Sequence, residues 1–325
     1  MNIQKCDVVA LGELLIDFAV VSQDENHYPT LAAKAGGAPA NFLATLSKYG
    51  VQTGLLAKVG DDVFGHLLVS TLKDCGVNTS GVTVDSTVFT TLAFVTIDDK
   101  GEREFSFARK PGADIALFFE DLNLKLIEDC TFFHFGSLSL TDEPVRTTTQ
   151  RAIALAKDMG KLITYDPNLR PSLWANWDEA REQILWGLSQ ADIVKISAEE
   201  TEFLWGCSPS ESGEILLSQY DLKLAMITLG AGGAIICNKN GMVQVPCPNV
   251  APIDTTGAGD IFGGAAISRI LTCGKAADML TEGEMKEIAV FSSVAASLST
   301  EKMGAIPSIP DIADILKITA SMHAT

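Results

Sequence analysis

Basic residues are scarce in this chain, which carries 24 lysines and arginines against 41 aspartates and glutamates. The formal net charge of −17 would repel nucleic-acid phosphates and acidic lipid headgroups. The composition therefore argues against nucleic-acid and membrane partners. ATP is a different case, because a local anion site can outweigh the global field at short range.

Paired cysteines and spaced histidines are also lacking. The seven cysteines are scattered with none in CxxC spacing, and the four histidines form no pair at metal-ligand spacing. This pattern argues against a disulfide framework and a zinc site, and it indicates reduced thiols in a cytoplasmic protein. No signal-peptide pattern is seen, and the longest apolar run, residues 224–237, contains three glycines and is too short to span a bilayer.

Two common nucleotide-binding signatures are missing. No Gly-Lys-Ser/Thr sequence occurs, so there is no P-loop lysine. The glycines at 230–233 fail as a dinucleotide fingerprint, because Ile235 stands at the third glycine position and a strand pattern follows. Any bound phosphate must therefore be held by other backbone amides.

A regular alternation of short apolar runs and amphipathic stretches is present. The runs predict strands at 8–11, 54–59, 132–135, 162–165, 193–196 and 225–229, and the amphipathic stretches predict helices at 38–49, 64–75, 144–159, 177–189 and 198–205. A capping box at 208–211 opens a further helix. This order predicts an α/β fold in which a mostly parallel sheet is covered by helices on both faces, with ligands bound at the carboxyl ends of the strands.

Two segments interrupt the alternation. Residues 14–21 look like a strand but are followed by a polar loop, and residues 91–97 and 102–109 flank a hairpin signal at 98–101. These strands are consistent with a small separate sheet, and a peripheral hairpin is the alternative.

The strongest chemical signal is Asp254-Thr255-Thr256-Gly257-Ala258-Gly259-Asp260, followed by a run of small and apolar residues. Glycines at a helix start leave backbone N–H groups open to an anion such as a phosphate. Asp260 then falls in the first turn, where its carboxylate is favoured in the ionised form and can accept a proton. An anion site beside a carboxylate base suits phosphoryl transfer to a hydroxyl, whereas a merely capped helix start is the simpler alternative.

A second glycine-rich turn, Gly36-Gly37-Ala38-Pro39-Ala40-Asn41, opens the helix predicted at 38–49. Its glycines let a ligand approach the backbone, and Asn41 offers both a donor and an acceptor. A strand-to-helix turn with an incidental asparagine is the alternative interpretation.

Together the two motifs resemble the paired signatures of the ribokinase-like, or PfkB, sugar kinases. The segments at 166–171 and 107–114 resemble the fructokinase branch. The resemblance implies a large α/β domain at 1–12, 36–90 and 112–325, and a β-sheet lid at 13–35 and 91–111. It also implies an ATP-dependent kinase that acts on a primary hydroxyl, with D-fructose favoured over 2-keto-3-deoxygluconate or ribose, and a candidate homodimer through the lid.

The resemblance further implies the site residues. Catalysis would involve Asp260, Gly257, Ala258, Gly259 and Arg170; the sugar would contact Asp17, Gly36, Gly37, Asn41, Arg109, Asn168 and Asp260; and the nucleotide would contact Thr228, Gly230, Gly233, Gly257, Gly259 and Ser293. Asp17 could instead be an edge-strand residue facing water, and Arg109 an exposed ion-pair partner.

Metal ions are implied in the same way. Glu200 would serve Mg²⁺ through water, although Ser197 stands where the family commonly has an asparagine. A K⁺ site is implied at Asp254, Thr256, Ser299, Gly304 and Ser308, where a helix end and loop is an equal alternative. A non-catalytic sugar-binding regulatory protein is the distant functional alternative, and an oxidoreductase is more distant still.

Overall fold

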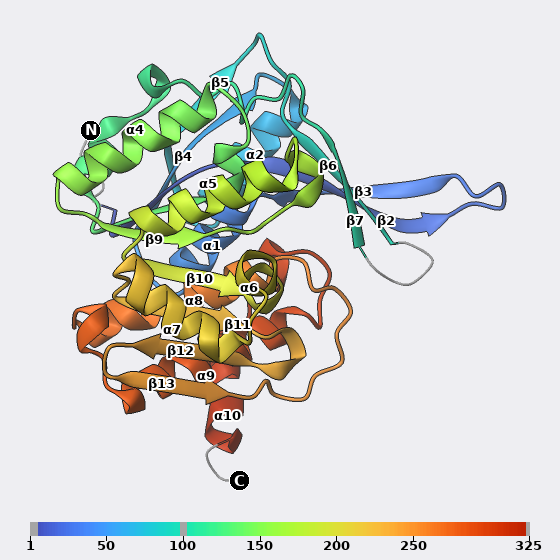
Figure 1. The fold of residues 1–325 in the computed structure, drawn as a ribbon. Coiled ribbons are helices and arrows are strands. Elements are labelled where there is room, and N and C mark those ends of the chain that lie inside the picture. The colour runs from blue at the N-terminus through green and yellow to red at the C-terminus, as the bar shows by residue number, and fades with distance from the viewer. Residues whose placement is uncertain (1–5, 98–102, 323–325) are drawn as a thin grey trace.

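The computed structural model describes residues 6–97 and 103–322, which form a nine-stranded sheet covered by helices and a separate four-stranded sheet (Figure 1). The strand order of the large sheet is β13-β12-β11-β10-β9-β8-β1-β4-β5. The strands from β11 to β5 pair in parallel, whereas β12 pairs antiparallel with both β11 and β13. The strands are β1 (Val8–Leu11), β4 (Thr53–Gly60), β5 (Asn78–Asp85), β8 (Phe132–Gly136), β9 (Leu162–Asp166), β10 (Ile193–Ser197), β11 (Leu224–Thr228), β12 (Ala234–Asn238) and β13 (Gly241–Val245).

Alternation along the strands creates two cores, one on each face of the large sheet. In β1, Val8 and Ala10 enter one core, and Val9 and Leu11 enter the other. The first core is covered by α1 (Ala38–Lys48), α2 (Val63–Asp74), α8 (Ala258–Cys273), α9 (Glu282–Ser299) and α10 (Ile312–Met322). The second is covered by α3 (Leu124–Asp129), α4 (Val145–Asp158), α5 (Trp177–Gln190), α6 (Ala198–Trp205) and α7 (Pro209–Tyr220). The predicted fold class is confirmed.

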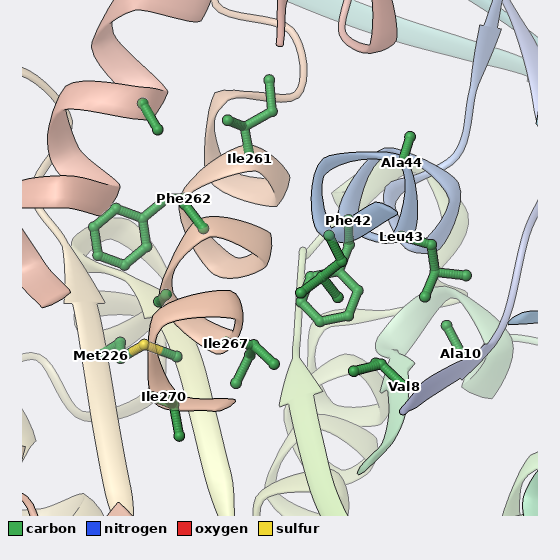
Figure 2. Packing of buried hydrophobic residues seen from close by; sticks show 14 of the residues in the cluster. Val8, Ala10, Phe42, Leu43, Ala44, Met226, Ile261, Phe262, Ile267 and Ile270 are labelled. Atoms are coloured by element: carbon green, nitrogen blue, oxygen red, sulfur yellow. The ribbon is translucent and has the colours of Figure 1, made fainter. Parts of the chain in front are cut away.

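Helices α1 and α8 pack together on the first face. Figure 2 shows Phe42 of α1, Ile267 of α8 and Val8 of β1 in one apolar cluster. Each helix carries a glycine-rich motif at its N-terminal end. The packing therefore brings those two motifs together beyond the carboxyl ends of the strands. Within the described residues, no helix combines the length and apolar character needed to cross a membrane.

The small sheet extends to one side of the large one (Figure 1) and has the order β3-β2-β6-β7. Its strands are β2 (Leu15–Gln23), β3 (Pro29–Gly36), β6 (Leu92–Ile97) and β7 (Arg103–Ala108). The antiparallel pairing of β6 with β7 matches the predicted hairpin, whose turn at 98–101 lies outside the described residues.

The prediction of a polar loop after residues 14–21 is wrong at residues 29–36, which form a strand. These residues form β3, which pairs antiparallel with β2. Four of its eight residues are alanine or glycine, and most of the strand is half-buried or exposed. No apolar alternation therefore marks it, and its backbone pairing with β2 defines the strand.

Candidate functional site

The N-terminal ends of α1 and α8 border a cavity of about 280 Å³. Its lining includes Asp17, Gly37, Asn41, Asn168, Arg170 and Asp260, which come from four separate stretches of the chain. We refer to this space as the first cavity. The structure thus brings together most of the residues predicted for the sugar and for catalysis.

Asp260 is buried in the first turn of α8. Its Oδ2 accepts a hydrogen bond of 2.8 Å from the Asn41 side-chain amide. Burial and the nearby Asp166 carboxylate raise the pKa of Asp260 to about 7, against the opposing effects of Asn41, Lys195 and Arg170. A carboxylate that titrates near neutral pH is suited to accept a proton from a hydroxyl.

The start of α8 borders the first cavity with glycine backbone. Gly257 precedes the helix in the left-handed conformation, with φ of 76°, and a β-carbon there would overlap Ala305. Gly257 and Gly259 both line the first cavity. Residues 257–259, which we call the anion cradle, therefore place backbone amides at the positive end of a helix, where the Ala258 N–H donates to the Thr255 carbonyl at 3.3 Å.

The first cavity also holds buried acceptor groups from α1 and β2. Asn41 Oδ1 is buried and accepts no hydrogen bond in the part of the chain that the structure describes. Burial raises the pKa of Asp17 to about 6, with Asp254 adding to the effect and Arg170 opposing it. Gly36 lies directly against the Asp17 carboxylate. A ligand rich in hydroxyl groups would satisfy these acceptors.

Asn168 and Arg170 follow β9 and reach the same cavity. Asn168 adopts a left-handed conformation, with φ of 46°, and its N–H lies 3.2 Å from Asp166 Oδ1. The charge of Arg170 lowers the pKa of both Asp17 and Asp260. Its guanidinium is therefore close enough to act electrostatically on both carboxylates.

A second cavity of about 520 Å³ shares Thr255 and Gly259 with the first. Four residues predicted to contact the nucleotide line it, namely Thr228, Gly230, Gly233 and Ser293. The Ser293 hydroxyl is buried and has no hydrogen-bond partner among the described residues. An elongated ligand could lie in the second cavity and extend an anionic end past Gly259 to the anion cradle.

Glu200 lies at the start of α6, near the cavities. Its two carboxylate oxygens accept the N–H groups of Leu169, at 2.7 Å, and Ser197, at 2.8 Å. No group of three His, Cys, Asp or Glu side chains converges on a metal position within residues 6–97 and 103–322. Because both oxygens already accept backbone N–H groups, Glu200 is better suited to bind the water ligands of a metal ion than to coordinate the ion directly.

Three residues of the predicted K⁺ site are joined by hydrogen bonds. Asp254 accepts the N–H of Thr256 at 2.9 Å and that of Gly304 at 2.7 Å. The buried Ser299 and Ser308 hydroxyls donate to the carbonyls of Ala296 and Ala305. These hydroxyls keep lone pairs for a cation, although their protons are engaged.

Arg109, which was predicted to contact the sugar, lies outside the lining of the first cavity. Its guanidinium is buried against Asp114, with Nη2 at 2.7 Å from Oδ2, and it also donates to Thr141 and to the Leu138 carbonyl. Arg109 is absent from the lining of the first cavity, and Phe107 of β7 lines it instead. Because its donors bind Asp114, Thr141 and the Leu138 carbonyl, Arg109 anchors the end of β7.

Sequence reasoning missed Lys195 and Glu13 as site residues. Both line the first cavity. Lys195 interrupts the apolar run of β10, and its ammonium lies 3.0 Å from Asp166 Oδ2. A β-carbon on Gly259 would lie 2.8 Å from that ammonium, so glycine is needed there for the close approach. A charged residue inside a buried strand was the available signal.

Comparisons with known proteins agree with this geometry. Residues 5–312 match the model of the pfkB family of carbohydrate kinases. The chain is 42% identical to Fructokinase-1 of Zea mays over 96% of this chain and 97% of the relative. A crystal structure of fructokinase with bound ATP from Xylella fastidiosa has a TM-score of 0.88 at 29% identity, covering 98% of this chain and 99% of that one. A fructokinase double mutant from Vibrio cholerae O395, with fructose, ADP and potassium bound, has a TM-score of 0.84 at 28% identity, covering 97% and 99%. This chain belongs to the pfkB family of carbohydrate kinases.

Proposed function

We propose that this protein is an ATP-dependent fructokinase, which transfers the γ-phosphoryl group of ATP to a primary hydroxyl of D-fructose. The observation that carries the proposal is the buried Asp260 carboxylate, which shares one cavity with the anion cradle and the Asn41 amide. The resemblance to fructokinases over nearly the whole length of both chains supports the choice of sugar.

In this proposal Asp260 takes the proton of the sugar hydroxyl as that oxygen bonds to the γ-phosphorus and the bond to the ADP oxygen breaks. The N–H groups of the anion cradle face the oxygens on which negative charge builds. Arg170 adds a fixed positive charge on the sugar side of the same cavity. Asn41 holds the base in position, since its amide is bonded to Asp260.

The metal ions belong to the same proposal. Mg²⁺, when bound with ATP, would neutralise phosphate charge, and Glu200 would orient its water ligands. The loop of Asp254, Thr256 and Gly304, with Ser299 and Ser308, would hold K⁺ and fix the start of α8. Hydroxyl and carbonyl oxygens are the ligands such ions prefer.

Three further features are proposed with the activity. The small sheet acts as a lid that excludes water from the first cavity when the sugar binds. Its exposed face offers a surface for a homodimer. The seven cysteines are free thiols in the structure, which is in keeping with a cytoplasmic protein.

A comparison of kcat/KM across D-fructose, ribose, 2-keto-3-deoxygluconate, glucose and adenosine tests the choice of sugar. The readout is the formation of ADP from ATP. D-Fructose should give the highest value, because a sugar lacking the matching hydroxyls leaves the buried acceptors unpaired. If another sugar exceeded fructose about tenfold, which corresponds to roughly 1.4 kcal/mol in transition-state binding, fructose would be the wrong substrate.

Replacing Asp17 with alanine should weaken sugar binding selectively. The carboxylate lines the first cavity and is absent from the lining of the second. Loss of a hydrogen bond to a charged group costs about 1.5–3 kcal/mol, so the KM for fructose should rise about 10- to 150-fold. The KM for ATP, measured on the same preparation, should stay within about twofold. A parallel rise of both constants would place Asp17 outside the sugar site.

A further inference from the structure

We propose that Glu13 is a sugar-binding residue, whose carboxylate fixes the first turn of α1 and accepts a hydroxyl of the sugar. This inference rests on the proposed function and adds a residue that the motifs of the sequence did not single out. The chemistry it requires is a ligand with a hydroxyl donor beyond those that reach Asp17 and Asp260.

Glu13 stands just after the carboxyl end of β1, separated from that strand by Gly12. Only 4% of the residue is exposed, and it lines the first cavity together with Asp17 and Asp260. A carboxylate so deeply buried is costly unless hydrogen-bond donors surround it. The identity of those donors decides what Glu13 does.

One donor comes from α1. The helix begins after Gly37, which has no side chain to cap it, and the second helical residue is Pro39, which has no N–H. The Ala38 N–H donates to Glu13 Oε1 at 2.9 Å, across 25 residues of sequence. Glu13 therefore supplies the missing N-terminal cap of α1 and fixes the turn that carries Asn41.

Few other donors to Glu13 are found among the residues that the structure describes. The backbone N–H groups of Glu13 itself and of Ala38 face the carboxylate, and the charge of Arg109 is offset by its partner Asp114. Burial outweighs these groups and raises the pKa of Glu13 to about 7. Since an ionised carboxylate can accept about four hydrogen bonds, acceptor capacity remains on the cavity side of Glu13.

A sugar hydroxyl would fill that capacity. Glu13, Asp17 and Asp260 are carboxylates on one cavity, and Asn41 adds a buried carbonyl oxygen that accepts no hydrogen bond within the described residues. Such an array of acceptors matches a ligand with several hydroxyl donors. A sugar without the hydroxyl that faces Glu13 would leave this carboxylate buried and short of donors.

The Glu13→Gln variant separates the two roles of the carboxylate. The glutamine carbonyl can still accept the Ala38 N–H, whereas its NH₂ group replaces an acceptor by a donor. We expect the variant to keep its unfolding temperature and its KM for ATP. Its affinity for D-fructose, measured by calorimetry without nucleotide, should fall about 10- to 100-fold.

Asp62→Asn is the matched control. Asp62 caps α2 by accepting the N–H groups of Phe64 and Gly65, and it lines neither the first nor the second cavity. This variant also exchanges a capping carboxylate for an amide, and it should bind fructose and ATP as the wild type does.

Monodeoxy derivatives of fructose identify the hydroxyl that Glu13 accepts. For one derivative the affinities of wild type and Glu13→Gln should converge, because the contact is already missing from the ligand. The inference would be overturned if Glu13→Gln bound fructose within twofold of the wild-type affinity. It would also be overturned if the variant lost the same factor of affinity for fructose and for every monodeoxy derivative. A wild type that phosphorylates no sugar contradicts the proposed function instead.

Discussion

Replacing Asp260 with asparagine should lower kcat for fructose phosphorylation by about 10²- to 10⁴-fold, the range typical of a lost general base. Asparagine keeps the shape of the side chain but cannot take the hydroxyl proton. The partner atom Asn41 Nδ2 lies 2.8 Å from the Asp260 carboxylate and can donate equally to an amide oxygen. Binding of fructose and ATP should therefore persist while turnover is lost.

The pH dependence of the wild type should carry the signature of the same residue. Because the pKa of Asp260 is about 7, kcat/KM should fall as the pH drops through that value and the base becomes protonated. Asp17 and Glu13, with pKa values of about 6 and about 7, should steepen the acidic limb. A rate that stays flat from pH 8 to pH 5 would contradict the assignment of Asp260 as the base.

The free energy of unfolding of Asp260→Asn serves as the control that the variant is folded. The folded-state pKa of Asp260 lies above its ordinary value of 3.8, so folding favours the protonated form, and that stabilisation is lost as the pH rises through about 7. The neutral asparagine avoids this loss. The variant should therefore equal or exceed the wild type in free energy of unfolding at pH 8, with the difference shrinking at pH 4. An unfolded variant would make the rate loss uninformative about chemistry.

Replacing Lys195 with methionine should have the largest effect on stability. The Lys195 and Asp166 side chains are each 10% exposed and form an ion pair at 3.0 Å. Burial lowers the pKa of Lys195, but Asp166, Glu200 and Asp260 outweigh it and hold the lysine charged. Removal of the ammonium leaves these carboxylates uncompensated, which should cost about 3–5 kcal/mol in the free energy of unfolding.

The double variant Lys195→Met/Asp166→Asn distinguishes charge from packing. Removing both members of a buried ion pair is commonly far milder than removing one. Urea denaturation should therefore show the double variant recovering at least half of the loss seen for Lys195→Met. If Lys195→Met alone cost less than about 1 kcal/mol, or if Asp166→Asn gave no recovery, the pair would not be the counter-charge that the site requires.

The fold was largely predictable because most elements satisfy their own local rules. Helix α6 spans Ala198–Trp205 as predicted, and Ser208 caps α7 by accepting the N–H of Glu211. Apolar runs in the parallel strands mark segments buried on both faces. Strand β3 escaped prediction because it is partly exposed, and only its pairing with β2 defines it.

The candidate site was predictable where a motif fixes the backbone geometry. It was less predictable where the contacts of a side chain depend on residues that are distant in the sequence. Gly257 and Asp260 are set by the start of a single helix. The direction of the Arg109 side chain depends on Asp114, Thr141 and Leu138, which the spacing of β7 does not specify. The partners of Lys195 and Glu13 lie 29 and 25 positions away in the sequence, so a local pattern could mark Lys195 as unusual but could not specify these contacts.

Transfer of a phosphoryl group from ATP to fructose can be followed directly by phosphorus NMR of the wild-type protein with Mg-ATP and D-fructose. We expect ADP and a sugar phosphomonoester in equal amounts, and we expect Asp260→Asn to form both far more slowly. Conversion of ATP to ADP and inorganic phosphate alone, or no conversion at all with fructose or any other sugar, would contradict the proposed transfer.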